Sequence, residues 1–67
     1  MTPGRRLART LQRMREERGL TQAQLAEKAG ISRDHLSRIE NRYADPAVGT
    51  LLRLAQALKV KLVDLVK

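Results

Sequence analysis

The segment from residue 21 to residue 41, TQAQLAEKAGISRDHLSRIEN, restricts the possible folds of this chain more than any other stretch. Thr21 and Gln24 have the spacing of a capping box, in which each side chain hydrogen-bonds the backbone N–H of the other residue at the start of a helix. Gly30 can adopt the left-handed conformation that ends a helix, and Ser32 is a good N-cap for the next one. The segment therefore predicts two short helices joined by a sharp turn.

Apolar residues recur at helical spacing on both sides of this segment. Before it, Leu7, Leu11 and Met14 mark one face of a helix. Pro3 and Gly4 disfavour helix and predict a short flexible arm through Gly4. Two further helices follow the central pair, so the chain is predicted to be all-α. The predicted helices cover about residues 5–18, 22–29, 33–41, 47–58 and 62–66.

The fourth predicted helix has two possible starts. Asp45 could cap it with Pro46 at the first helical position, or it could begin at Val48 with Ala47 as a poor cap. The short central helices cannot stand alone, so an apolar face of this helix is expected to pack in the core. The residues expected on that buried face are Val48, Leu51, Leu52, Ala55 and Leu58.

Length and composition limit the chain to one small domain. Sixty-seven residues are close to the size at which a single core is only marginally stabilising, and the one aromatic residue is Tyr43. Without cysteine there is no disulfide and no thiolate metal site. No apolar run approaches membrane-spanning length, and the basic N-terminus lacks the apolar stretch of a signal peptide, so we expect a cytoplasmic protein.

The formal net charge of +7 predisposes the chain to polyanionic partners. Residues 1–18 carry six Arg against two Glu, a net +4. Residues 19–42 carry four basic and three acidic residues, and residues 43–67 carry four and two. Composition alone therefore allows DNA, RNA or an acidic protein as the partner.

The second helix of the central pair separates its residues into two faces. Leu36 and Ile39 lie on the face expected to be buried. The opposite face presents a polar, hydrogen-bonding surface made of Arg33, Asp34, Ser37, Arg38 and Asn41. Such a surface suits base edges in a DNA major groove, where Arg pairs with guanine and Asn with adenine. The alternative is a merely solvated helix face.

Two charged residues fall on or beside stripes that otherwise face inward, Arg15 and Glu40. An unpaired buried charge is too costly to persist, so we expect the two side chains to meet in an ion pair. The planar guanidinium can grip a carboxylate with two hydrogen bonds. The alternative is that each side chain lies at a margin of the core and reaches solvent.

The sequence GLTQAQLAEKAGISRDHLSRIEN, followed by P-x-V-x-T-L-L-x-L-A-x-A-L-x-V, resembles the phage-repressor and Cro-type, lambda-repressor-like helix-turn-helix family. The resemblance covers nearly the whole chain, and the small Ala26 and the turn residue Gly30 fall in the family register. It implies a compact five-helix DNA-binding domain whose third helix enters the major groove, usually in a symmetric dimer. It also implies an ion pair at the positions of Arg15 and Glu40.

The resemblance also assigns site residues by position. Those that match base-contacting residues are Arg33, Asp34, Ser37 and Arg38, and those that match backbone-contacting residues are Gln22, Asn41, Arg42 and Tyr43. Arg42 departs from the family pattern, because glycine is common at the end of this helix. We expect the Arg42 side chain to reach a phosphate instead.

The arginines of the first helix give a weaker signal. A solvated surface is the expectation for at least half of the four at positions 5, 6, 9 and 13. Arg5 and Arg6, beside the predicted flexible arm, are the best candidates among them for contacts to the DNA backbone.

The sequence gives little support for an enzyme, and we expect no cofactor, metal or small-molecule ligand. Ser32 and Ser37 are accounted for as a cap and as a groove-facing residue. His35 has no positioned nucleophile and no second metal ligand near it, and no glycine-rich phosphate loop occurs.

The expected function is a sequence-specific, double-stranded DNA-binding transcriptional regulator of prokaryotic or phage origin, most simply a repressor. It is expected to act as a homodimer on a near-palindromic operator, with a possible dimer interface at Leu62, Val63 and Val66. The alternative is an antitoxin-type module of the same fold, which binds a toxin and autoregulates its operon. Self-association favours the first function, and a different protein bound at the fourth and fifth helices favours the second.

Overall fold

The computed structural model describes residues 3–42 and 44–66, with residues 3–5 described by their backbone alone. Its helices are α1 (Pro3–Glu17), α2 (Gln22–Ala29), α3 (Arg33–Glu40), α4 (Val48–Leu58) and α5 (Leu62–Val66). These residues contain no strand, so the predicted all-α, five-helix fold is confirmed. None of the described helices has the length and apolarity that crossing a membrane requires.

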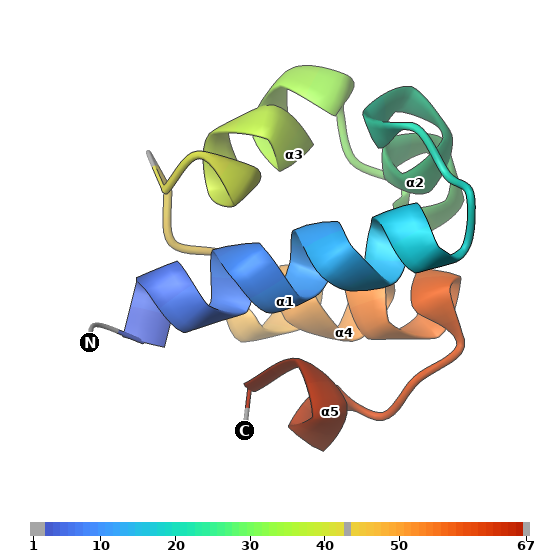
Figure 1. The fold of residues 1–67 in the computed structure, drawn as a ribbon. Coiled ribbons are helices and arrows are strands. Elements are labelled where there is room, and N and C mark those ends of the chain that lie inside the picture. Colours follow the sequence, from blue (N-terminus) through green and yellow to red (C-terminus); the bar gives the residue numbers. More distant parts are fainter. Residues whose placement is uncertain (1–2, 43, 67) are drawn as a thin grey trace.

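The longest helix, α1, lies across the middle of the domain (Figure 1). In this view α2 and α3 lie above α1, α5 lies below it, and α4 runs behind it. Contacts join α2 to both α3 and α4, and they join α1 to α3 and α5. The pair α2 and α3 is therefore supported by α1 on one side and by α4 on the other.

Leucines from every helix fill the core. The largest fully buried side chains are Leu11, Leu25, Leu36, Leu54, Leu58 and Leu65. On α2, Ala26 and Ala29 are buried among them, and their small size lets α3 and α4 approach closely. Because helices as short as α2, α3 and α5 are unstable in isolation, their stability depends on this shared core.

The predicted start and end signals of α2 and the predicted start signal of α3 are confirmed. Thr21 Oγ1 accepts a hydrogen bond from the Gln24 N–H at 3.1 Å, and Gln24 Oε1 accepts one from the Thr21 N–H at 2.9 Å, which completes the capping box. Ser32 Oγ accepts from the His35 N–H at 3.0 Å at the start of α3. Gly30 ends α2 in the left-handed conformation, with φ of 73°. Local signals therefore determine the sharp turn between the two helices.

The predicted boundaries of α1 and α3 differ from the observed ones. The expectation of a flexible arm through Gly4 is wrong for Pro3 and Gly4, which belong to α1. Proline is compatible with the first helical position, because the N–H that it lacks would have no acceptor there. α1 ends at Glu17 and α3 at Glu40, each one residue earlier than predicted.

Of the two possible starts of α4, the structure has the second. The helix begins at Val48 with Ala47 as its N-cap, and no side chain hydrogen-bonds this end. The alternative cap by Asp45, with Pro46 as the first helical residue, is therefore wrong. The predicted range of this helix, residues 47–58, therefore begins one residue too early.

The buried face of α4 is rotated relative to the predicted one. Leu54, Ala55 and Leu58 are buried, whereas Val48 and Leu52 are 65% and 43% exposed. The leucines of this helix lie on two overlapping stripes of similar apolarity. The prediction is right for Ala55 and Leu58 and wrong for Val48 and Leu52, while Leu51 is half-buried. Packing against α2 and α5 determines which stripe is buried.

Lys59 ends α4 in a conformation that costs free energy. Its φ is 59°, in the left-handed region, and its N–H donates to the carbonyl oxygens of Ala55 and Gln56. A residue with a Cβ loses about 1–2 kcal/mol in this conformation. We expect Lys59→Gly to raise the free energy of unfolding by about 0.5–1 kcal/mol, after allowance for the greater entropy of glycine in the unfolded chain. Thermal unfolding should show a Tm raised by a few degrees.

Lys59→Ala is the matched control for this prediction. It removes the same charge but retains the Cβ, so the backbone strain remains. The glycine variant should therefore melt at a higher temperature than both the alanine variant and the original protein. Equal Tm values for the glycine and alanine variants would show that Lys59 is not strained.

Candidate nucleic-acid interface

The outward face of α3 is polar and open. Arg33, Asp34 and Arg38 are exposed and Ser37 is half-buried, while the opposite face of the helix is packed in the core. A single α-helix fits into the DNA major groove, which is about 12 Å wide. The face of α3 therefore has the exposure and the polar side chains that a helix needs to enter this groove.

The charged side chains of this face have no partners within the part of the chain that the structure describes, whereas Ser37 Oγ accepts a hydrogen bond from Asn41 Nδ2. The guanidinium groups of Arg33 and Arg38 form no hydrogen bond or ion pair with the described residues. Asp34 is likewise unpaired there, so it does not form the ion pair with Arg38 that would offset its repulsion of phosphates. The remaining favourable partner for this carboxylate in the groove is the amino group of cytosine.

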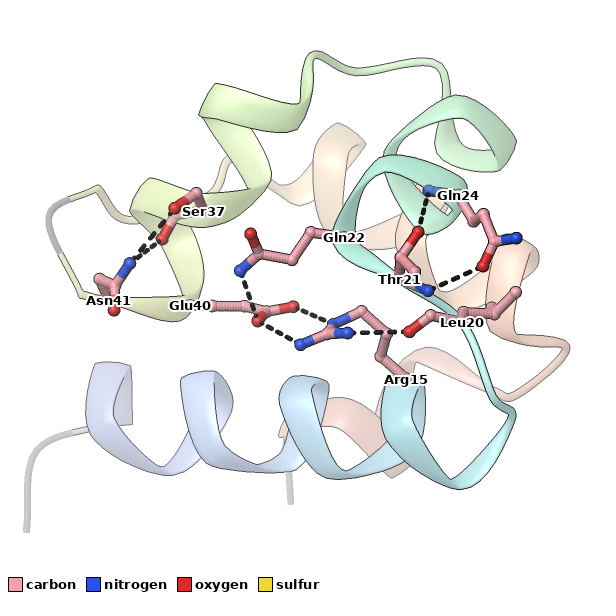
Figure 2. A network of polar contacts seen from close by, with 8 residues as sticks. All are labelled: Arg15, Leu20, Thr21, Gln22, Gln24, Ser37, Glu40 and Asn41. Carbon is pink, nitrogen blue, oxygen red and sulfur yellow. Dashed lines mark hydrogen bonds and ion pairs between the residues drawn. The ribbon is translucent and has the colours of Figure 1, made fainter.

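A buried ion pair holds α3 against α1. Arg15 Nε donates to Glu40 Oε2 at 2.8 Å, and Arg15 Nη2 donates to Glu40 Oε1 at 3.1 Å (Figure 2). The two side chains are 11% and 3% exposed, so the two-point contact is shielded from water. Arg15 Nη1 donates to the carbonyl oxygen of Leu20 at 2.8 Å. The structure thus brings together the two charged residues that were predicted to meet. Through Leu20, the same arginine also holds the segment before α2.

The same carboxylate also holds the first residue of α2. Gln22 Nε2 donates to Glu40 Oε1 at 3.0 Å (Figure 2). Sequence reasoning assigned Gln22 to a DNA phosphate and missed this bond; the available signal was that a carboxylate has more acceptor sites than one arginine fills. Because an amide nitrogen carries two hydrogens, Gln22 can keep this bond and still donate to a phosphate oxygen.

The end of α3 is built without glycine. Asn41 Nδ2 donates to the Ser37 carbonyl oxygen at 2.9 Å and to Ser37 Oγ at 3.3 Å (Figure 2). Arg42 then adopts a left-handed conformation with φ of 65°, and its N–H donates to the Ile39 carbonyl oxygen at 3.1 Å. The Ser37 carbonyl oxygen already accepts the Asn41 N–H at 2.9 Å, so the Asn41 side chain adds a second hydrogen bond to the same acceptor.

The remaining predicted DNA-backbone residues are described only in part. Arg6 on α1 is exposed. The side chain of Arg5 and the residue Tyr43 lie outside the described residues. Arg42 is exposed, and its guanidinium has no partner among the described side chains.

Large apolar side chains are exposed on α4 and α5. Val63 and Val66 lie one turn apart on α5 and are 54% and 50% exposed, whereas Leu62 is half-buried. On α4, the misassigned Val48 and Leu52 are also exposed. These exposed apolar residues are chemically distinct from the polar face of α3.

The described side chains do not form a metal site. No group of three or more His, Cys, Asp or Glu side chains among them is arranged to hold an ion. His35 is half-buried on α3. The chemistry offered by the face of α3 is therefore hydrogen bonding and charge, from guanidinium, carboxylate and hydroxyl groups.

Known proteins share this sequence pattern. A family profile described as helix-turn-helix matches residues 11–65. The chain is 46% identical over 54 residues to the uncharacterized HTH-type transcriptional regulator y4dJ of Sinorhizobium fredii, a match that covers 81% of this chain and 70% of that protein. It is 44% identical over 61 residues to the immunity repressor protein of Bacillus phage phi105. This match covers 91% of this chain but only 40% of the repressor.

Solved structures share the fold. The hypothetical transcription factor NHTF from Neisseria has a TM-score of 0.95 at 26% identity, over 98% of this chain and 76% of that one. The restriction-modification controller protein C.AhdI from Aeromonas hydrophila has a TM-score of 0.91 at 26% identity, over 92% of this chain and 94% of that one. The biofilm regulator SinR, solved in complex with DNA, has a TM-score of 0.87 at 29% identity, over 91% of this chain and 98% of that one. Together with the profile match over residues 11–65, these similarities show that the chain belongs to the helix-turn-helix family of transcriptional regulators.

Proposed function

We propose that this protein is a sequence-specific, double-stranded DNA-binding repressor that acts as a homodimer on a near-palindromic operator. The observation that carries the proposal is the exposed polar face of α3, whose charged side chains have no partners among the described residues. An ion pair holds this helix rigidly in place. The similarity of the chain to SinR, whose structure was solved in complex with DNA, also supports DNA binding.

Two kinds of contact have separate roles in the proposed complex. Arg33, Asp34, Ser37 and Arg38 contact base edges, which determines the preferred sequence. Gln22, Asn41 and Arg42 contact phosphates, which set the register of the domain on the duplex, as do Arg5, Arg6 and Tyr43 from the flanking segments. The formal charge of +7 supports the second kind of contact.

The proposed homodimer follows from the size of the domain and from its apolar surface. The longest extent of the domain is 28 Å, whereas successive major grooves on one side of the duplex are about 34 Å apart. One copy therefore reaches one half-site, and a second copy is needed for the other. The exposed Val63 and Val66 of α5, with Leu62 beside them, supply the apolar contact between the copies. Repression then follows from exclusion of polymerase from the operator.

Substitution of two residues separates base contacts from phosphate contacts. Arg38→Ala is expected to weaken binding to the preferred sequence by about 1–3 kcal/mol and binding to unrelated DNA much less, because a base contact is lost. Gln22→Ala is expected to weaken binding to all sequences about equally. Fluorescence anisotropy with an operator selected from random DNA and with a scrambled duplex measures both effects.

Arg53→Ala serves as the matched control, because Arg53 is an exposed arginine on α4. It removes the same charge as Arg38→Ala but leaves α3 intact, so the ratio of operator to scrambled affinity should stay unchanged. If Arg38→Ala also leaves this ratio unchanged, α3 is not the recognition helix. A nearly flat plot of log K against log salt concentration would contradict the phosphate contacts.

A further inference from the structure

A polar hollow lies between the first half of α1 and the end of α3. Its volume is about 390 Å³, and it is lined by Ala8, Arg9, Gln12, Glu40 and Arg42. Ala8 is buried, whereas Arg9, Gln12 and Arg42 are exposed around it. The hollow therefore opens to solvent, and the exposed residues that line it carry two guanidinium groups and an amide.

The carboxylate in this hollow is already neutralised. Glu40 accepts two hydrogen bonds from Arg15, at 2.8 and 3.1 Å, and a third from Gln22 at 3.0 Å. By contrast, the side chains of Arg9 and Arg42 have no partner among the described residues. The hollow thus carries two uncompensated positive charges next to a carboxylate whose own charge is balanced. Such an arrangement attracts an anion, and guanidinium groups bind phosphate oxygens in a two-point geometry.

The hollow also lies close to the proposed DNA-backbone residues of the other helices. Gln22 at the start of α2 bonds the same Glu40 that lines the hollow, and Asn41 and Arg42 directly follow Glu40 at the end of α3. In Figure 2, the Gln22 amide lies beside the Glu40 carboxylate, and Asn41 lies at the end of α3 next to it. A DNA strand that contacts Gln22 and Asn41 therefore passes the hollow.

We propose that this hollow binds a backbone phosphate of the DNA, held by the guanidinium groups of Arg9 and Arg42 and by the amide of Gln12. The proposal rests on the proposed function, and it deepens that function by making the first half of α1 part of the DNA interface. It assigns a role to Arg9, which the sequence pattern placed among arginines expected mainly on a solvated surface. Because phosphates are common to all sequences, this site adds affinity without adding sequence preference.

The salt dependence of DNA binding tests this site. Arg9→Gln should reduce the slope of log K against log salt concentration by about 0.9 per subunit, because one counterion fewer is released. The same relation gives an affinity loss of about fivefold per subunit at 0.15 M salt, equal for operator and scrambled DNA. Arg9→Lys should retain most of the slope. Arg53→Gln, on α4, is the matched control and should leave the slope nearly unchanged.

Different results would refute the phosphate site and the proposed function. If Arg38→Ala alters sequence discrimination but Arg9→Gln changes the slope no more than Arg53→Gln does, the hollow is not a DNA phosphate site and the function stands. If the unsubstituted protein discriminates no sequence, the proposed function itself fails. Thermal unfolding with added inorganic phosphate at constant ionic strength tests a free anion as the ligand. Stabilisation by phosphate that is lost in Arg9→Gln, without a change in the DNA slope, would overturn the proposal.

Discussion

Glu40→Leu is expected to lower the free energy of unfolding by about 3–5 kcal/mol, because it leaves the Arg15 guanidinium buried without its carboxylate. Arg15 is 9% exposed, so solvent cannot replace the two lost hydrogen bonds without a rearrangement of α1 and α3. For 67 residues, the total stability expected is only about 3–10 kcal/mol. The variant should therefore unfold at a much lower urea concentration or remain largely unfolded.

A double-mutant cycle distinguishes the ion pair from two independent losses. Arg15→Met alone should be about as damaging as Glu40→Leu, because it leaves a buried carboxylate with only Gln22 as a partner. The double variant removes both charges and should lose less stability than the sum of the two single losses, by a coupling energy of about 1–3 kcal/mol. Glu27→Leu, at an exposed position of α2, controls for the substitution itself and should change stability by less than about 0.5 kcal/mol. Additive losses in the cycle would show that the two residues do not stabilise the fold as a pair.

Local signals predicted the parts of the fold that depend on neighbouring residues. The capping box of Thr21 and Gln24, the Ser32 cap and the left-handed Gly30 all act within four residues, so their chemistry is visible in the sequence. The meeting of Arg15 and Glu40 was predictable for a different reason. Two charges on inward-facing stripes leave few alternatives, since each needs a partner.

Features that depend on tertiary packing were not predictable in the same way. The rotation of α4 that buries Leu54 and exposes Leu52 depends on where α2 and α5 lie. The exposed Arg18 bonds the carbonyl oxygen of Leu58, 40 residues away, and so ties the end of α1 to the end of α4. No periodicity in the sequence encodes such contacts.

In the candidate site, too, some features were predictable from the local sequence and others depend on tertiary packing. The polar face of α3 follows from helical spacing, so Arg33 and Arg38 were assigned from the sequence alone. The bond from Gln22 to Glu40 joins residues 18 positions apart, and the hollow beside Arg9 brings α1 to the end of α3. Both arise only when the helices have packed.

Val63→Glu is expected to convert the proposed dimer into a monomer and to lower operator affinity by about 10²- to 10⁴-fold. Val63 is 54% exposed, so a charged side chain can be accommodated in the free domain without loss of the core. In the dimer the same carboxylate would be buried against its symmetry-related copy, where like charges repel. Analytical ultracentrifugation measures the oligomeric state, and anisotropy with a full operator and with a single half-site measures the affinity.

Val63→Lys separates the loss of the dimer from a change of charge near DNA. A glutamate lowers the positive charge of the domain and a lysine raises it, so a purely electrostatic effect on DNA binding would have opposite signs in the two variants. Loss of the dimer predicts weaker operator binding in both, with half-site affinity changed far less. If both variants remain dimeric, α5 is not the interface, and the exposed Val48 and Leu52 on α4 become the next positions to substitute. If the unsubstituted protein is itself monomeric and binds a second, different protein through α5, the antitoxin-type function is favoured over the dimeric repressor.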